Sequence, residues 1–184
     1  MLPAMFAGWE TFYTLLGEAS AALIGLLFVV ATLTSTVDRE RRTRGQSLFL
    51  TPVVFKFGSV LALSAVALAP GLPHGASRWL AAVVGLVGVA NLGGVSTALL
   101  RGKLSSPLHW SDPWCYGLVP TLVFAAIAAC PVLLDPADAG RAVGAATAAL
   151  LLLAVRNAWD LVTTLAGQAV EARADSTTPG GGAG

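Results

Sequence analysis

Long apolar stretches alternate with short polar or charged segments along almost the whole chain. Five of these stretches are long enough to cross a bilayer as helices, which takes about 20 residues each. They cover residues 11–33, 47–69, 79–100, 114–134 and 142–165. The segments between them are rich in proline, glycine or charge, which is typical of loops. The pattern predicts an all-α polytopic membrane protein, a bundle of five transmembrane helices that forms one domain over residues 1–168.

The first apolar stretch carries a carboxylate among small residues. On a helix, Thr14, Glu18 and Gly25 share one face, since each residue turns about 100°. Gly17, Ala21 and Gly25 form an adjacent stripe of small residues, which lets another helix approach closely. We therefore expect this helix to pack through that face and to present Glu18 to its neighbours.

The end of the chain has a different composition. Residues 169–184 are polar and rich in glycine. Such a segment has too little apolar surface to stabilise a fold. The sequence predicts a disordered cytoplasmic tail over these residues.

The basic residues of the predicted loops are unevenly distributed. Two lie on one side of the predicted bundle, Arg78 and Arg141. Seven lie on the other side, in the first loop, the third loop and the tail: Arg39, Arg41, Arg42, Arg44, Arg101, Lys103 and Arg173. Cytoplasmic loops carry the excess of lysine and arginine. This distribution predicts a multi-pass protein of the bacterial inner membrane, with its N-terminus outside and its C-terminus in the cytoplasm.

Composition and charge agree with the membrane class. Hydrophobic residues make up 55% of the chain and charged residues 11%, whereas a soluble domain has about 25% charged residues. The net charge is +1, and no basic run is interleaved with aromatic residues. We therefore expect the lipid bilayer as a partner and no nucleic acid.

Four charged residues nevertheless fall inside predicted spans, together with two asparagines. Ionisable residues at such positions are rare and are candidates for function. Counting 1.5 Å per residue from the helix ends places the two asparagines and the lysine near one level, just inside the midplane. The predicted intramembrane polar layer consists of Glu18, Lys56, Asn91, Arg156, Asn157 and Asp160.

This polar layer has two interpretations. In the first, Arg156 pairs with Asp160 within one helix and Lys56 pairs with Glu18, so that the layer only holds the helices together. In the second, the layer is a polar path for an ion, a proton or a small solute. Paired acids have no oxygens to spare for a cation, which weighs against a cation channel.

Other chemistry has no visible residues. His74 and His109 lie in loops on opposite sides of the predicted membrane, so they cannot share a metal. No nucleophile, phosphate-loop or metalloprotease motif is present, so we expect no catalytic residues, no metal, no cofactor and no enzymatic activity. Four glycines are interpreted as sites of close helix packing: Gly85, Gly88, Gly93 and Gly94.

Several short motifs resemble a loose group of uncharacterised small bacterial multi-helix integral membrane proteins. They are Trp9-Glu10-x-Phe12-Tyr13, Glu18-x-x-Ala21-Ala22-Leu23-x-Gly25-Leu26-Leu27-Phe28-Val29, Thr51-Pro52, Trp114-x-Tyr116-x-x-x-Pro120 and Arg156-Asn157-Ala158-Trp159-Asp160-Leu161. Together they touch four of the five predicted helices, and the last is the most specific. The resemblance implies a multi-helix membrane protein and no particular activity.

The sequence therefore favours a structural or modulatory membrane component. It would act through helix contacts with itself, as a homo-oligomer, or with another membrane protein. The alternative is a small channel or transporter that uses the polar layer.

Overall fold

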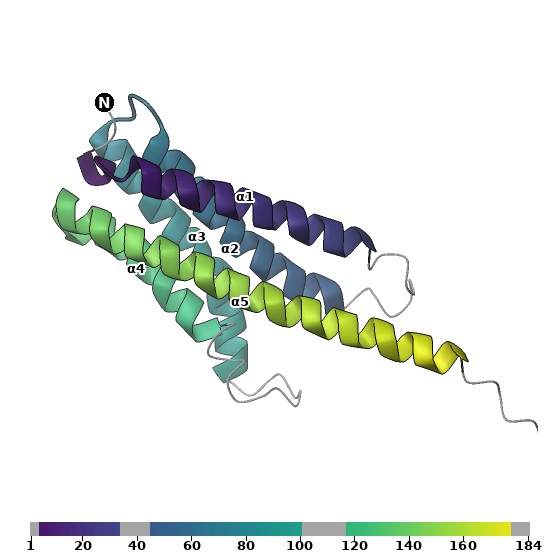
Figure 1. Cartoon of the computed structure of the whole chain (residues 1–184). Coiled ribbons are helices and arrows are strands. Elements are labelled where there is room, and N and C mark those ends of the chain that lie inside the picture. The colour runs from purple at the N-terminus through teal and green to yellow at the C-terminus, as the bar shows by residue number, and fades with distance from the viewer. Residues whose placement is uncertain (1–3, 34–44, 101–116, 178–184) are drawn as a thin grey trace, which may run out of the picture.

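The computed structural model describes residues 4–33, 45–100 and 117–177. These residues are helical almost throughout (Figure 1), and short turns join α2 to α3 and α4 to α5. A short 3-10 helix, η1, precedes five α-helices. The elements are η1 (Ala4–Phe6), α1 (Glu10–Leu33), α2 (Gly45–Leu68), α3 (His74–Leu100), α4 (Val119–Leu133) and α5 (Pro136–Thr177). The predicted all-α class is therefore confirmed.

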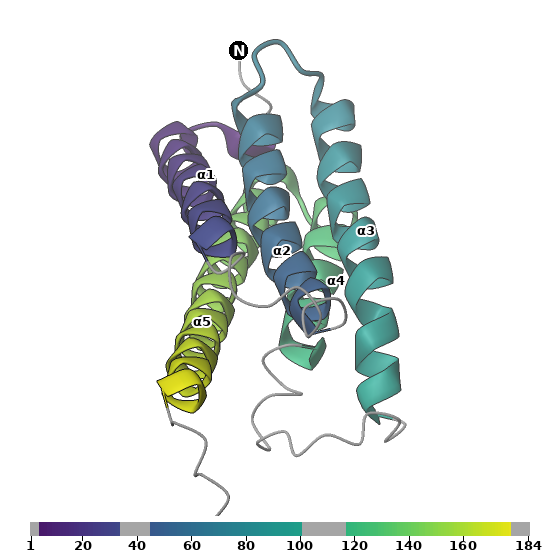
Figure 2. The ribbon, with the colours of Figure 1, turned by 90° about the vertical axis from the view of Figure 1, so that its right-hand side faces the viewer.

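The helices form a bundle in which helices that follow one another in the chain pack side by side. α1 packs against α2 and α3 against α4, while α5 lies against both α2 and α4. Figure 2 shows α2 between α1 and α3, with α4 behind them. The far end of α5 extends beyond the bundle (Figure 1).

Among the described residues, three helices are long and apolar enough to cross a membrane. The segments that meet this test are Glu10–Thr32, His74–Gly93 and Pro136–Asp160. Two shorter apolar segments, Pro52–Leu68 and Val119–Leu133, lie in α2 and α4. The membrane class predicted from the sequence therefore holds by length and composition.

Three helices have bounds that differ from the apolar pattern by more than two residues. α4 begins at Val119, after the predicted start at residue 114, and α5 begins at Pro136, before the predicted start at residue 142. α3 begins at His74 instead of residue 79, because the polar turn that precedes the apolar stretch is already helical. α5 continues to Thr177, so residues 169–177 are helical where the sequence predicted a disordered tail. Alanine, glutamate and arginine all have high helix propensity, but the glutamate and arginine side chains are charged, so an apolar pattern ends where this part of the helix continues. Residues 178–184 lie outside the described part.

The core near the start of α1 is closed by residues that precede that helix. Met5 and Phe6 of η1 are buried, with exposed fractions of 3% and 1%. The Phe6 ring meets the Tyr13 ring edge to face, with 5.1 Å between centroids. Gly140 of α5 allows the Met5 carbonyl to approach, since a Cβ there would collide with it. η1 therefore seals one end of the bundle.

Two glycines bring α3 and α4 into close contact. A Cβ on Gly85 would lie 2.7 Å from the Cα of Ala128, and a Cβ on Gly88 would overlap the ring of Phe124. Real Cβ atoms do not approach so closely, so the helices can meet at this distance only where the side chain is a hydrogen atom. This confirms the interpretation of Gly85 and Gly88 as packing positions. The same interpretation is wrong for Gly93 within one chain, since nothing lies within 4 Å of a Cβ built there, and the side-chain surroundings of Gly94 lie outside the described part.

The outward surfaces of the helices are apolar. Large side chains that are more than half exposed occur on every helix that can span a membrane, and they include Leu26, Phe28, Leu86 and Leu152. A soluble protein rarely exposes so much contiguous apolar surface. Such a surface fits lipid tails or the helices of other membrane proteins.

Candidate functional site

The most buried polar contact among the predicted residues joins α2 to α5. Lys56 has no exposed surface, and neither has Asn157. With the amide oriented by its hydrogen-bond network, the Lys56 ammonium donates to the Asn157 side-chain oxygen at 2.5 Å. The amide nitrogen donates in turn to the carbonyl oxygen of Leu153 at 3.3 Å. The asparagine is thus held by its own helix while it accepts from the other.

Buried apolar residues flank this contact on both helices. Val53 and Phe57 of α2 and Ala154 of α5, within one turn of Lys56 and Asn157, form one buried cluster with Leu27 of α1. An ammonium ion in such surroundings is costly unless its protons are hydrogen-bonded. The contact with Asn157 therefore offsets part of the cost of burying Lys56, and it fixes α2 relative to α5.

The other predicted members of the polar layer lie elsewhere. Glu18 on α1, Asn91 on α3 and Arg156 on α5 are exposed, and Asp160 is half-buried. The sequence therefore predicted a layer of six residues, of which the structure brings Lys56 and Asn157 together by a direct hydrogen bond.

Neither of the two predicted ion pairs forms. Arg156 makes no ion pair with Asp160, although both side chains belong to the described part of α5. Glu18 points away from the interior in which Lys56 is buried. An ion pair that does form, Arg141 with Asp138 at 2.8 Å, lies on the exposed start of α5. The i, i+4 spacing on a helix allows Arg156 and Asp160 to pair, but it does not determine the side-chain rotamers, which here keep the two charges apart.

The predicted small-residue stripe is divided between two environments. A Cβ on Gly17 would lie 3.1 Å from the Cβ of Ser64 on α2, so Gly17 is a packing position. Ala21 is exposed, and nothing lies within 4 Å of a Cβ built on Gly25. Within one chain, the expectation that Gly25 contacts another helix is therefore wrong.

A row of buried hydroxyl groups, which the sequence analysis missed, follows the interior face of α1. Ser20 donates to the carbonyl oxygen of Phe57 at 2.6 Å. One and two turns before it lie Gly17, which packs on Ser64, and Tyr13. Serine and threonine fit into apolar helices without breaking the pattern, but their spacing on the Gly17 face was a signal that could have been used.

One of these buried hydroxyl groups, that of Ser64, lacks a hydrogen-bond partner. The Thr147 hydroxyl of α5 donates to the carbonyl oxygen of Val143 at 2.7 Å. Its oxygen lies beside the Tyr13 hydroxyl and can accept a hydrogen bond from it. Buried groups without a partner are uncommon in native structures, and a water molecule is their usual partner.

Arg78 has a structural role that its position in a predicted loop did not reveal. Its guanidinium donates to three carbonyl oxygens at the end of α4, those of Pro131 at 2.5 Å, Val132 at 3.3 Å and Leu134 at 3.4 Å. The last carbonyls of a helix have no partner within it, and a cation there also complements the helix dipole. Arg78 therefore links the start of α3 to the end of α4 by hydrogen bonds.

Within the ranges described, no three histidine, cysteine or acidic side chains come together as a metal site would require. The comparisons with known proteins also identify no relative: the chain matches no family model, no curated protein and no solved structure. The resemblance inferred from its motifs therefore stays a prediction.

Proposed function

We propose that this chain is a component of the bacterial inner membrane that acts structurally or as a modulator, through helix contacts with itself or another membrane protein. In this proposal it catalyses no reaction. All five helices cross the bilayer, the N-terminus lies outside, and the C-terminus lies in the cytoplasm.

The division of the polar residues between inside and outside carries this proposal. Lys56 is enclosed in a contact that joins two helices of the same chain. Glu18 and Arg156 instead face outward from helices that can span a membrane. Charged groups there favour contact with another polar group over contact with lipid tails. The interior contact of Lys56 thus stabilises the bundle, while the outward charges of Glu18 and Arg156 are available to polar groups of another protein.

The first helix is the one best placed to meet a partner. Only 22% of its spanning segment is buried within the chain, compared with 44% for α5. Its outward residues include small ones, Ala21, Ala22 and Gly25, between larger apolar side chains. Small residues allow the close helix approach on which association in membranes depends.

The five-span arrangement is supported by packing. α2 lies against α1, and α4 lies against α3. A shorter apolar helix that packs along a spanning helix is expected to cross the bilayer as well. If it ended inside the bilayer, the unpaired backbone N–H and C=O groups at its end would lie in hydrocarbon, which is costly. The orientation rests on the seven basic residues against two in the predicted loops.

Photocrosslinking in the native membrane tests the proposal. A photoreactive residue replaces Ala22 on α1 or, as a control, Leu86 on α3, both of which are exposed. We expect a protein adduct from position 22 and adducts mainly with lipid from position 86. Lipid adducts alone from position 22 would contradict a function through helix contacts.

A second candidate function, transport of a small solute, is favoured by buried hydroxyl groups between α1 and α2. The Ser64 hydroxyl of α2, which has no partner, lies against Gly17 of α1. Ser20, one turn further along α1, donates to the carbonyl oxygen of Phe57, the residue that follows Lys56. Water molecules bound to these groups would form part of a polar path. Proteoliposomes test this directly: solute flux that is lost in Lys56→Met would favour transport over the structural role.

A further inference from the structure

Two opposite charges lie unpaired on outward faces of this chain. Glu18 on α1 and Arg156 on α5 are exposed, and neither forms an ion pair or hydrogen bond with any residue in the described ranges. Both lie within segments that can span a membrane, Glu10–Thr32 and Pro136–Asp160. A lone ion in hydrocarbon is unfavourable, and such residues normally have partners. Because their charges are opposite, Glu18 and Arg156 could each supply the ion-pair partner that the other lacks.

The outward surface around Glu18 is formed mainly by small residues. Nothing lies within 4 Å of a Cβ built on Gly25, so this glycine borders open space. Large side chains lie on either side of it, and Leu26 and Phe28 are 60% and 62% exposed. We call these exposed residues the α1 face: Thr14, Glu18, Ala21, Ala22 and Gly25.

The surface around Arg156 is shaped as a ridge. Leu152 and Trp159, one turn before and one turn after it, are each 69% exposed. With Val155 and Arg156 they form the α5 face. Large side chains on one helix pack over small residues on another when helices associate. The α1 face and the α5 face are thus complementary in side-chain size as well as in charge.

The depths of the two faces also agree. α1 and α5 run in the same direction (Figure 1), and a Cβ on Gly144 would lie 3.3 Å from the ring of Trp9 and 3.6 Å from the ring of Phe12. These contacts place Gly144 of α5 level with residues 9–12. Counted along the two parallel helices, Arg156 then lies level with residues 21–24, which is three to six residues, or about 5–9 Å, beyond Glu18 toward the helix C-terminus. An arginine side chain leans toward the start of its helix and can cover this gap. Trp159 then lies near the level of Gly25.

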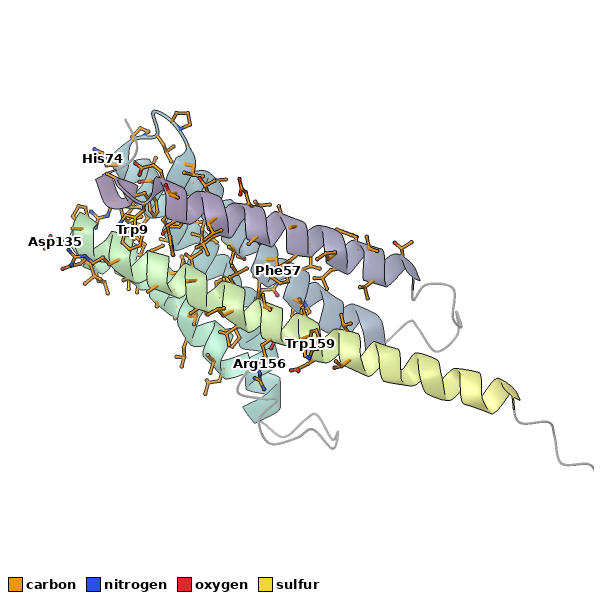
Figure 3. All side chains as sticks on the ribbon, viewed as in Figure 1. Trp9, Phe57, His74, Asp135, Arg156 and Trp159 are labelled. Carbon is orange, nitrogen blue, oxygen red and sulfur yellow. The ribbon has the colours of Figure 1, made fainter. Side chains whose placement is uncertain are left out.

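The pair cannot close within one chain. Figure 3 shows Arg156 on the side of α5 turned away from α1, and both side chains are exposed in the folded chain. A second copy with the same orientation in the membrane keeps every residue at its own depth. It can therefore bring its α5 face against the α1 face of the first copy.

We propose that copies of this chain associate through these two faces, with Arg156 of one copy paired with Glu18 of the next. The inference rests on the proposed function and names the contact through which it would operate. Because the two faces differ, the contact is head to tail, and repetition around an axis normal to the membrane closes a ring.

Disulfide crosslinking between two differently tagged copies tests this contact. The cysteines are placed beside the charges, as Ala21→Cys in one copy and Val155→Cys in the other, in full chains that carry Cys115→Ala and Cys130→Ala. We expect a crosslinked dimer that contains both tags. Ala21→Cys paired with Val83→Cys, which lies on the exposed surface of α3, should give none.

Charge variants identify the pair itself. Glu18→Arg or Arg156→Glu in both copies should lower the crosslink yield by about threefold or more, and the two changes together in each copy should restore it. Glu18→Gln, which keeps the shape of the side chain, should lower the yield without repulsion. A yield that none of these changes affects would overturn the charge pair.

The failure of this inference can be distinguished from the failure of the proposed function. A crosslink between two copies of Ala21→Cys, with none to Val155→Cys, would overturn the head-to-tail contact and leave function through helix contacts intact. The same holds if position 22 photocrosslinks only to a different protein. Lipid adducts alone would overturn both.

Discussion

The ammonium of Lys56 and the amide oxygen of Asn157 lie 2.5 Å apart and join α2 to α5 in the interior of the bundle. Neither side chain has exposed surface. Because Asn157 also donates to the carbonyl oxygen of Leu153 on its own helix, its amide cannot turn without losing one of the two contacts. A lysine and an asparagine therefore replace the pair of opposite charges that the sequence suggested.

The contact between α3 and α4 should be sensitive to any added side chain. Gly85→Val introduces atoms where the backbone of Ala128 already lies, and we expect it to destabilise the protein by about 1–3 kcal/mol or to separate the helices. Gly93→Ala is the matched control, because nothing lies within 4 Å of a Cβ there. It should be neutral or stabilising by up to about 1 kcal/mol. Unfolding in mild detergent measures both, and equal stability of the two variants would contradict the close packing.

Removal of the Arg78 side chain should loosen the end of α4. Arg78→Ala leaves three carbonyl oxygens without this donor, and a loss of about 1–3 kcal/mol is expected for a charged hydrogen-bond donor. Arg141→Ala is the control, since its pair with Asp138 is exposed and should contribute less than about 1 kcal/mol. Amide hydrogen exchange at residues 132–134 reports the local effect. Unchanged exchange in Arg78→Ala would rule out this capping role.

Two serines on facing helices should respond in opposite ways to the same substitution. Ser20→Ala removes a hydrogen bond to the carbonyl oxygen of Phe57 and should cost about 0.5–1.5 kcal/mol. Ser64→Ala removes a buried hydroxyl that has no partner, so it should be neutral or slightly stabilising. Thermal unfolding of the two variants decides. A loss of stability in Ser64→Ala would mean that its hydroxyl binds water, as the transport hypothesis requires.

The membrane class and the helices were predictable from the sequence, while the pairing of the polar residues was not. Apolar length identifies a helix that can span, because burial in lipid demands it. Apolar length does not locate the end of a helix that continues into polar residues. For this reason the predicted end at residue 165 fell short of the end of α5, which is Thr177. Depth placed Lys56 and Asn157 at one level correctly. Depth alone could not say that Glu18 and Arg156 face outward, since the direction of a side chain depends on which helices pack together.

The orientation in the membrane can be measured with single cysteines. From the distribution of basic residues, a cysteine in place of Gly75 should react with an impermeant reagent added outside intact cells. A cysteine in place of Gly45, at the start of α2, should react only after the cells are opened. Labelling of both positions from the same side would contradict the crossing of α2.

The most direct test of a structural polar interior is a double-mutant cycle on Lys56 and Asn157. Asn157→Leu alone leaves a buried ammonium without this acceptor and should destabilise the bundle by about 1–3 kcal/mol. Lys56→Met combined with Asn157→Leu replaces the contact with apolar side chains and should recover part of that loss. We expect a coupling energy of about 0.6–1.7 kcal/mol, as for side-chain hydrogen bonds between membrane helices. Effects of the two substitutions that add to within about 0.3 kcal/mol would contradict the account.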